Sequence, residues 1–223
     1  LLVKGLIIPF RKSKSAANYK EVWTAEGSPL LVETQKAADA LQKSLGDDYQ
    51  VEVGMRYGEP SFQTCKEKLK NCEKIVFFPQ YPQYAASSVQ TSLDHFFKFF
   101  DPKSVKVVPP YYDHPEFLKA YGLFLKNKLS GKKMDRLLMS FHGLPESHLE
   151  KADPSSSHCL KVDNCCAKAN GDVLKYCYRA QCYKSGHGIA DAAGLTSEQY
   201  SISFQSRLGR QKWIEPYTED MYK

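Results

Sequence analysis

The chain has 223 residues, of which 42% are hydrophobic and 25% charged, which is enough to bury one large core or two smaller ones. Its 31 basic and 25 acidic residues give a net charge of +6, with the two signs mixed along the chain and no basic tract. This pattern does not indicate nucleic-acid binding; it suits solvated helix faces, with some attraction for an anionic small molecule or a lipid surface. No apolar run approaches the length of a membrane span, and no signal peptide is recognisable.

Short apolar runs alternate with segments of helical periodicity along the chain. Runs rich in β-branched and aromatic residues predict strands at 51–57, 75–78, 105–108, 136–141 and 200–204. The periodic segments predict helices at 33–45, 61–71, 87–100 and 115–129, and a weaker one near 189–193. Because parallel neighbours need a crossover helix, this order predicts an α/β fold with doubly wound parallel sheets.

Aromatic, amide and ionisable residues follow the ends of four predicted strands. They lie in residues 55–60, 79–84, 140–145 and 204–210, with Gly and Pro fixing the turns. Open α/β sheets bind ligands outside the carboxyl ends of their strands. One histidine after a strand is more often structural than catalytic, but four such strand ends together predict a ligand site.

Five of the seven cysteines fall in one polar stretch, at Cys159, Cys165, Cys166, Cys177 and Cys182. Between them stand mainly Lys, Asp, Asn, Gly, Arg and Gln, so we expect that these thiols are not all small apolar residues of a packed core. A disulfide framework fits poorly, since the count is odd and the chain is long. Thiolates favour zinc, copper(I) or iron–sulfur clusters, so the stretch predicts a metal centre in a reducing, cytoplasmic protein.

Read together, these motifs resemble those of the ferrochelatase family, in the same order. The matching segments are residues 27–30, 56–58, 79–84, 140–145, 153–154, 204–209 and 213–219. The resemblance covers nearly the whole chain. It implies an enzyme that inserts Fe²⁺ into a porphyrin dianion to make haem, in a cleft between two similar doubly wound domains.

The same resemblance implies roles for individual residues. His142 corresponds to the essential histidine of the family, which acts as the base for the pyrrole protons or as a metal ligand. The residues implied on the porphyrin side are Ser28, Arg56, Tyr57, Tyr81, Tyr84, Arg207 and Trp213. These residue types suit the reaction, because a neutral imidazole accepts protons near neutral pH, aromatic walls suit a flat macrocycle, and Arg or hydroxyl donors suit its propionates.

The cysteines depart from the commoner family pattern, which has one cysteine after the tyrosine motif and three in a C-terminal extension. Here an internal insertion carries them, as in some bacterial members. We expect one [2Fe–2S] cluster held by Cys159, Cys177, Cys182 and one of Cys165 or Cys166, because two adjacent cysteines do not easily both ligate in one compact site. Zinc is the alternative, since four thiolates also close a tetrahedral zinc site. The metal would order a segment that has too little apolar surface to fold alone.

The family pattern also includes segments before Leu1 and after Lys223, so we expect a chain truncated at both ends, with uncertain activity of its own. Residues 1–110 are interpreted as the remainder of the first chelatase-like domain. Residues 111–223 are interpreted as the start of the second, with the cysteine-rich insertion at about 155–185. Protoporphyrin IX and coproporphyrin III are both candidate substrates. The alternatives are a chelatase for another metal and a non-catalytic tetrapyrrole- or iron–sulfur-binding module.

One further partner is a membrane surface, suggested by four aromatic residues in the predicted helix at 87–100. They are Phe96, Phe97, Phe99 and Phe100. We interpret them as the buried flank of a helix and keep peripheral membrane contact as the alternative.

Overall fold

A computed structural model describes residues 16, 17 and 19–222 of the chain. The chain divides into two compact units, Leu1–Glu73 and Lys74–Lys223. The domain boundary predicted at residue 110 falls within the second unit and stays a prediction.

The first unit contains helices α2 (Pro29–Leu45) and α3 (Phe62–Lys68). Helix α2 begins with a proline after Ser28 and ends at Gly46, whose positive φ of 78° suits a residue without a side chain. Helix α3 buries Phe62 and Cys65. Both helices confirm predicted segments, although α3 is shorter than expected because the chain leaves helical geometry at Leu69.

The strand predicted at 51–57 is wrong. Met55 alone forms a parallel bridge, with Ser61, and its N–H donates to the Pro60 carbonyl at 2.7 Å. Residues 51–54 have suitable β-branched side chains, but a strand also needs a neighbour with which to exchange backbone hydrogen bonds. None pairs with them among the residues that the structure describes.

The second unit begins with a short parallel pair, β1 (Ile75–Phe77) and β2 (Val105–Val107). The connection between them contains a π-helical turn (Ala86–Gln90), α4 (Thr91–Phe96) and a 3₁₀ turn (Pro102–Ser104). Phe96 is buried and stacks on Phe77 and Phe100, with ring centroids 4.1 and 4.3 Å apart. This packing agrees with the interpretation of these aromatics as a helix flank.

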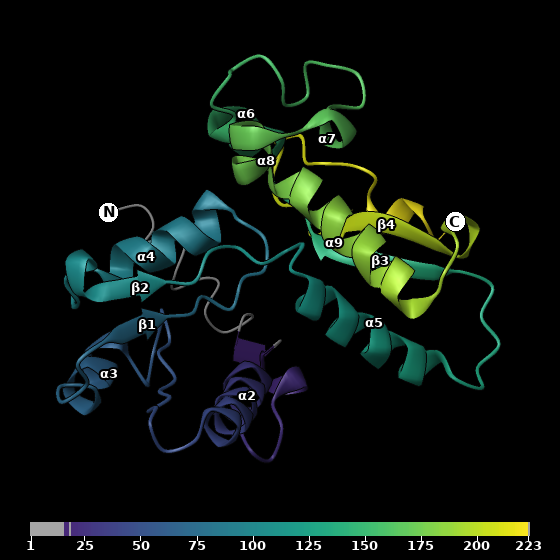
Figure 1. The fold of residues 1–223 in the computed structure, drawn as a ribbon. Coiled ribbons are helices and arrows are strands. Elements are labelled where there is room, and N and C mark those ends of the chain that lie inside the picture. Colours follow the sequence, from purple (N-terminus) through teal and green to yellow (C-terminus); the bar gives the residue numbers. More distant parts are fainter. Residues whose placement is uncertain (1–15, 18, 223) are drawn as a thin grey trace. The chain divides into compact units, whose positions relative to one another are not determined.

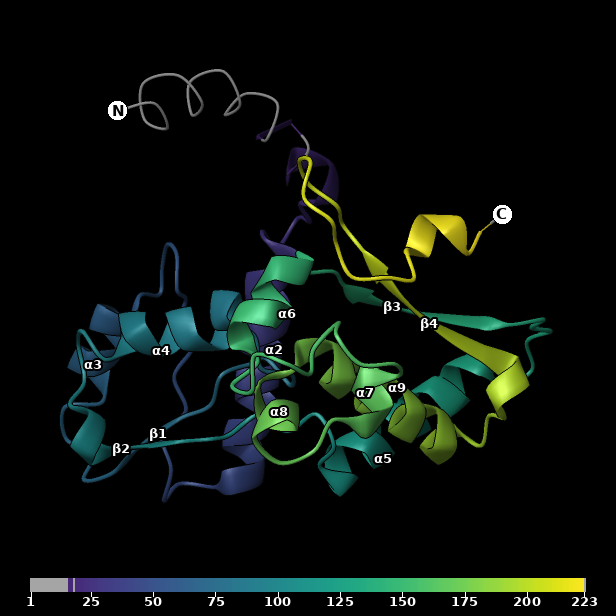
Figure 2. The ribbon, with the colours of Figure 1, turned by 90° about the horizontal axis from the view of Figure 1, so that it is seen from above.

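The second parallel pair is β3 (Leu137–His142) with β4 (Tyr200–Gln205), in register from Leu137 opposite Tyr200 to His142 opposite Gln205 (Figures 1 and 2). Four of the five predicted strands are thus found, and the α/β fold with parallel strands is confirmed. A 3₁₀ turn (Ser197–Gln199) leads into β4, and another (Thr218–Asp220) follows it.

Two helices accompany this pair: α9 (Tyr178–Ala193) packs against β4, and α5 (Pro115–Leu129) packs against α9. They approach closely at Gly122, where a Cβ would lie 2.4 Å from the Ala192 Cβ. Gly186 of α9 allows a similar approach to β4, because a Cβ there would lie 2.5 Å from Ile202 Cδ1. Glycine at these points lets the backbones pack together without a void.

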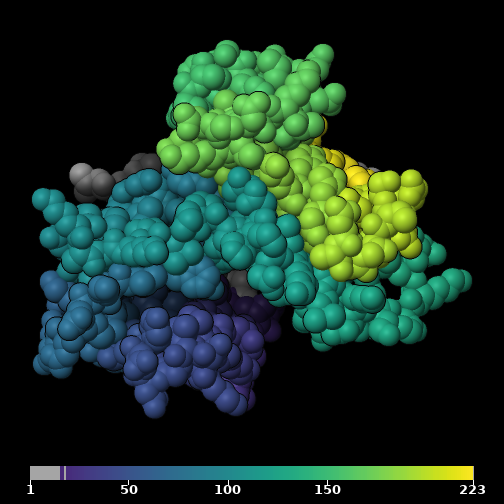
Figure 3. Space-filling view, in the orientation of Figure 1, coloured from purple at the N-terminus to yellow at the C-terminus, as the bar shows by residue number. Residues whose placement is uncertain are grey.

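The cysteine region is more ordered than its composition predicts. It contains α6 (Glu146–Ala152), α7 (Cys165–Lys168) and α8 (Gly171–Tyr176), and the weak helix predicted at 189–193 is only the end of α9. Figure 3 shows this green region packed as a continuous mass against α9. Among the described residues, no helix combines the length and the apolar character that crossing a membrane requires.

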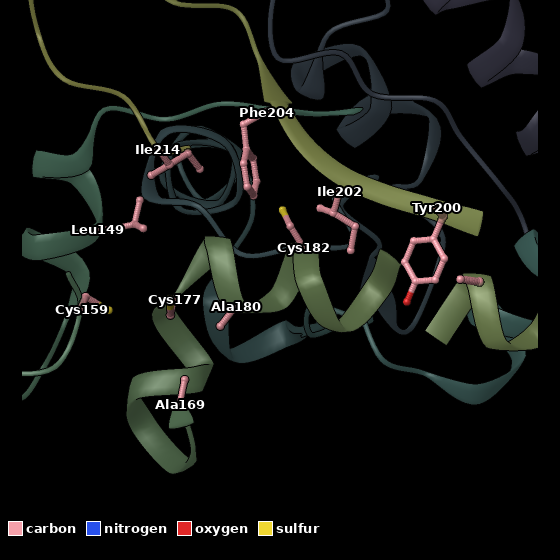
Figure 4. Packing of buried hydrophobic residues seen from close by; sticks show 11 residues of the cluster. Leu149, Cys159, Ala169, Cys177, Ala180, Cys182, Tyr200, Ile202, Phe204 and Ile214 are labelled. Atoms are coloured by element: carbon pink, nitrogen blue, oxygen red, sulfur yellow. The ribbon is translucent and has the colours of Figure 1, made fainter. Parts of the chain in front are cut away.

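Four of the five clustered cysteines are buried, and Cys166 is half-buried. Cys159, Cys177 and Cys182 belong to the core beside Leu149 and Phe204 (Figure 4). These three thiols are core residues in spite of the polar residues between them, whereas Cys166 only packs against this cluster and Cys165 lies outside it, so the five thiols are not all core residues. Short helices can turn their few apolar and sulfur side chains inward while the polar residues between them face solvent.

Candidate functional site

His142 is the last residue of β3, and its side chain reaches the surface. Its Nδ1 lies 2.6 Å from the carbonyl oxygen of Gly143. A carbonyl only accepts hydrogen bonds, so Nδ1 carries the proton in neutral His142 and Nε2 keeps its lone pair. The imidazole can therefore accept a proton or bind a metal ion through Nε2.

The turn after His142 is fixed by backbone pairing with two other segments. Gly143 N–H donates to the Gln205 carbonyl at 2.7 Å, and a Cβ at residue 143 would lie 2.9 Å from that oxygen. Pro145 forms a bridge with Trp213, and Ile214 N–H donates to the Leu144 carbonyl at 3.0 Å. This pairing brings the Trp213 ring within 6.5 Å of the His142 ring, centroid to centroid.

Arg207 follows β4, two residues beyond the strand partner of His142. Its guanidinium pairs with Glu219 and lies over the Tyr217 ring, 4.1 Å from the centroid. Gln205, Arg207 and Tyr217 help to line a cavity of about 240 Å³. The carboxyl ends of β3 and β4 thus present a histidine, an arginine and aromatic rings at one edge of the sheet.

Tyr81 and Tyr84 lie in the loop that follows β1. Tyr81 is exposed, whereas Tyr84 is half-buried with its ring edge-on to Tyr176 at 5.2 Å. Burial raises the pKa of Tyr84, and the nearby Tyr176 and Asp94 add to this effect. The phenol therefore stays protonated as a hydrogen-bond donor near neutral pH.

Helix α9 holds the Tyr84 loop through a fully buried amide side chain. Gln181 Oε1 accepts from the Tyr84 N–H at 2.6 Å, and its Nε2 donates to the carbonyls of Leu174 and Lys175 at 2.8 and 2.9 Å. One turn further, Ser185 Oγ accepts from Gln83 at 2.8 Å.

The same helix also holds the His142 turn. Tyr178 OH donates to the His142 carbonyl at 2.9 Å. Burial is the main reason that the pKa of Tyr178 lies above its ordinary value, so the hydroxyl keeps the proton that it donates. Sequence reasoning missed both Tyr178 and Gln181, because polar side chains inside a helix read as solvated and nothing in their spacing distinguishes them.

The remaining predicted porphyrin-side residues belong to the first unit. Ser28 precedes α2 and makes no capping hydrogen bond with its side chain. Arg56 lies over the ring of the exposed Tyr57, with its Cζ 4.8 Å from the centroid. Their roles in binding remain predictions.

Four of the five cysteine thiols come together at the start of α9. Cys177 shares side-chain hydrogen bonds with Cys159 and Cys166, and the Sγ atoms of Cys165 and Cys166 lie 4.0 Å apart. The Cys166 hydrogen bond is the largest cause that lowers the pKa of Cys177, to about 6; burial opposes it, while the Ala180 N–H and Cys159 assist. Burial raises the pKa of Cys159 to about 12. The hydrogen bonds and the burial of this group therefore shift the pKa values of Cys177 and Cys159 in opposite directions.

Cys182 is not brought into this group. Its thiol bonds to Tyr178, and Figure 4 shows its sulfur directed toward Phe204 and Ile202, away from Cys159 and Cys177. In the part of the chain that the structure describes, no set of three or more His, Cys, Asp or Glu side chains is arranged to hold a metal ion as it stands. The chemistry of the donors nevertheless fits a soft metal, because four thiols gather within one short segment.

Asp153 organises the loop that leads to Cys159. Its carboxylate accepts hydrogen bonds from the N–H groups of Ser155, His158 and Cys159 at 3.0, 2.8 and 2.8 Å, and from the Ser155 hydroxyl at 2.7 Å. Burial by itself would raise the pKa of Asp153. The four hydrogen bonds, led by that of Cys159, outweigh burial and hold the pKa far below its ordinary value.

Parallel strands that deliver a histidine, an arginine and aromatic rings to one edge are those of an α/β protein, a class that typically binds ligands outside its strand ends. The ferrochelatase family model matches residues 1–223, so the chain belongs to the ferrochelatase family.

Curated relatives agree with this assignment. The chain is 44% identical over 224 residues to the ferrochelatase of Pseudomonas syringae pv. syringae (strain B728a), and 45% identical to that of Ectopseudomonas mendocina (strain ymp). It is 37% identical over 221 residues to the ferrochelatase of Coxiella burnetii (strain RSA 493 / Nine Mile phase I). Each comparison covers 98% of this chain, and the chain spans 65%, 65% and 62% of the length of these relatives.

Proposed function

We propose that this chain carries the histidine-bearing rim of a ferrochelatase, which inserts Fe²⁺ into protoporphyrin IX or coproporphyrin III in haem biosynthesis. In this reaction a free-base porphyrin loses two N–H protons while one divalent cation enters, so the product is neutral at the macrocycle and two protons leave. A group that accepts protons near neutral pH is needed beside the ring.

The observation that carries the proposal is the hydrogen bond between the His142 ring and the Gly143 carbonyl. The Nδ1 atom of His142 is bonded to this carbonyl, which leaves the Nε2 lone pair for a pyrrole proton or for the incoming iron. Trp213 stands beside the imidazole and offers a flat apolar surface to a macrocycle.

The other predicted residues take supporting roles in this proposal. Tyr81 and Tyr84 form part of an aromatic wall, and Arg207 pairs with a propionate after exchanging its partner Glu219. Ser28, Arg56 and Tyr57 are proposed as porphyrin-binding residues on the family resemblance alone.

The test is the substitution His142→Ala in the purified full-length protein, with iron insertion followed by visible absorption. We expect turnover to fall by at least about a hundredfold, the lower end of general acid–base contributions, while porphyrin binding is retained. His148→Ala is the matched control, since His148 is an exposed histidine on the adjacent α6. Turnover of the His142 variant within a few-fold of wild type would refute the assignment.

We also propose that the cysteine region holds a metal centre, preferably a [2Fe–2S] cluster, with zinc as the alternative. Cys159, Cys166 and Cys177 supply three ligands. The fourth is Cys182, as the sequence predicts, or Cys165, which the sequence disfavours as the neighbour of Cys166 but whose Sγ lies 4.0 Å from that of Cys166. The fit is supported by the shared hydrogen bonds of the three thiols and by an unpartnered buried nitrogen of the neighbouring Arg179. When bound, such a centre supplies a covalent cross-link between α9 and the loop before it, and in the iron form a one-electron couple. Clustered thiols of this kind favour a reducing, cytoplasmic location.

Anaerobic preparation followed by iron, acid-labile sulfide and zinc analysis tests the centre. Two irons with sulfide per chain support the cluster, one zinc supports the alternative, and a metal-free protein with reactive thiols contradicts both. The substitutions Cys165→Ala and Cys182→Ala distinguish the two candidates for the fourth ligand, because only the substitution of the true ligand should lower the metal content.

A further inference from the structure

Arg179 stands in the first turn of α9, two residues after Cys177, and is only half-exposed. Its Nε is buried and has no hydrogen-bond partner. Its Cζ lies 5.9 Å from the centroid of the Tyr183 ring, so the guanidinium is held against that side chain.

No carboxylate lies within ion-pair distance of Arg179 among the described residues. The groups that interact with it electrostatically are Cys166 and Cys165, together with the phenol of Tyr183, and Arg179 acts in turn on Cys177. The guanidinium also hydrogen-bonds to the Tyr183 phenol, which is neutral. An arginine side chain is always charged in a protein, and partial burial of that charge is costly unless a negative partner is close. The groups placed to become that partner are the clustered thiols.

We infer that Arg179 is the counter-charge of the metal–thiolate centre at Cys159, Cys166 and Cys177, where it stabilises the bound centre and raises its tendency to accept an electron. This inference rests on the metal centre proposed above. Four thiolates with an oxidised [2Fe–2S] core carry a net charge of −2, and one-electron reduction makes it −3, so a fixed cation beside the centre favours the reduced form. With zinc, the same cation favours the thiolate-bound state over free zinc and protonated thiols.

Because the Arg179 guanidinium is partly buried, its charge should act on the metal centre more strongly than the charge of an exposed residue on the same helix. Lys184 lies five residues further along α9 and is exposed, so water and salt screen its charge. Lys184→Gln is therefore the matched control for Arg179→Gln, because each substitution removes one positive charge from the same helix. Arg179→Lys keeps the charge and changes only the shape of the donor.

The experiment compares these three variants with wild type after anaerobic preparation, with iron, sulfide and zinc measured first and folding checked by circular dichroism. In an iron–sulfur protein, a redox titration followed by visible absorption should show that Arg179→Gln has at least a tenfold smaller reduced-to-oxidised ratio at a fixed potential, equivalent to about 59 mV for one electron. The reduced-to-oxidised ratio of Arg179→Lys should stay within about threefold of the wild-type ratio, and the ratio of Lys184→Gln should equal that of wild type.

If the metal is zinc, the rate of its transfer to a chelator replaces the potential, and Arg179→Gln should release it at least tenfold faster. Equal behaviour of Arg179→Gln and Lys184→Gln in the loaded protein overturns the role of Arg179 but leaves the metal centre standing. A wild-type protein that contains neither iron with sulfide nor zinc overturns the centre itself, and the role of Arg179 with it. If Arg179→Gln does not fold, the test rests on Arg179→Lys, which keeps the charge. Loss of metal from this variant, or a tenfold change in its reduced-to-oxidised ratio or zinc-release rate, also contradicts a role based on charge.

Discussion

Gln181→Leu should be among the most destabilising single substitutions in the second unit. The Gln181 side chain is fully buried and makes three hydrogen bonds, at 2.6, 2.8 and 2.9 Å, to the backbone of Tyr84, Leu174 and Lys175. Leucine has a similar size but no polar atom, so one N–H and two carbonyls would lose their partner in the interior.

Each buried polar group left unsatisfied costs about 1–3 kcal/mol. Local relaxation and water access reduce the sum, and the added apolar surface of leucine offsets a further part, so we expect a net loss of about 3–5 kcal/mol. A loss of this size is a large fraction of the 5–15 kcal/mol that holds an ordinary domain folded. Gln83→Leu is the control, since the Gln83 amide donates a single hydrogen bond, to Ser185, and should cost about 1 kcal/mol.

The free energy of unfolding can be measured by urea denaturation in a Trp23→Phe background. The chain has two tryptophans, and Trp213 then reports on the second unit alone. If Gln181→Leu costs no more than Gln83→Leu, the three hydrogen bonds do not hold α9 to the Tyr84 loop and the reasoning fails.

Three further substitutions test other contacts of the second unit. Gly122→Ala should destabilise by about 1–3 kcal/mol in the same urea assay, because its Cβ would lie 2.4 Å from the Ala192 Cβ; an unchanged midpoint would show that α5 and α9 can separate freely. Tyr178→Phe removes the hydrogen bond to the His142 carbonyl and should lower kcat of iron insertion more than it changes KM, while stability falls by only about 1 kcal/mol; wild-type kcat would rule out this positioning role. Asp153→Asn should lower stability at pH 7, and this difference should shrink as the pH falls below the ordinary carboxyl pKa of 3.8, because a depressed folded-state pKa gives stability that is lost on protonation; a difference that is constant down to pH 2 would contradict it.

The sequence predicts well those parts of the fold that are determined by neighbouring residues in the chain. Helix α5 matches its predicted bounds of 115–129, because a proline opens it and apolar residues follow the helical period. Strand β3 is a run of apolar residues that ends at His142, and its role at the sheet edge follows from the parallel order.

The parts that the sequence does not predict depend on contacts between distant residues. Residues 51–54 have side chains that favour a strand, but no strand pairs with them among the described residues. A high β propensity alone does not form a sheet. The first turns of α9 look polar, and only the structure shows that Gln181 is buried with every polar atom bonded. Five clustered cysteines predict a metal centre, but not that Cys182 turns away from Cys159 and Cys177.

The first turn of α9 connects the cysteines to both strand-end loops. Cys177 begins the helix, Tyr178 bonds to the His142 turn and Gln181 bonds to the Tyr84 loop, all within five residues. Helix ends fray, and the cap residue of this helix, Cys177, offers only a weak sulfur acceptor to the Ala180 N–H. A metal bound by Cys177 would fix the turn instead.

Removal of the metal should therefore loosen the strand-end loops through this turn. In amide hydrogen exchange of the chelator-treated protein, we expect faster exchange at Gln181 and at Tyr84, whose N–H groups bond to the Cys177 carbonyl and to Gln181 Oε1. Val108, directly after β2, serves as the internal reference, since its N–H donates to the Phe77 carbonyl of β1 at 2.9 Å. Faster exchange confined to the loop around Cys159 and to α7, with Gln181 and Tyr84 unchanged, would mean that the metal orders only its own segment and that the rim is held by the hydrogen bonds of α9 alone.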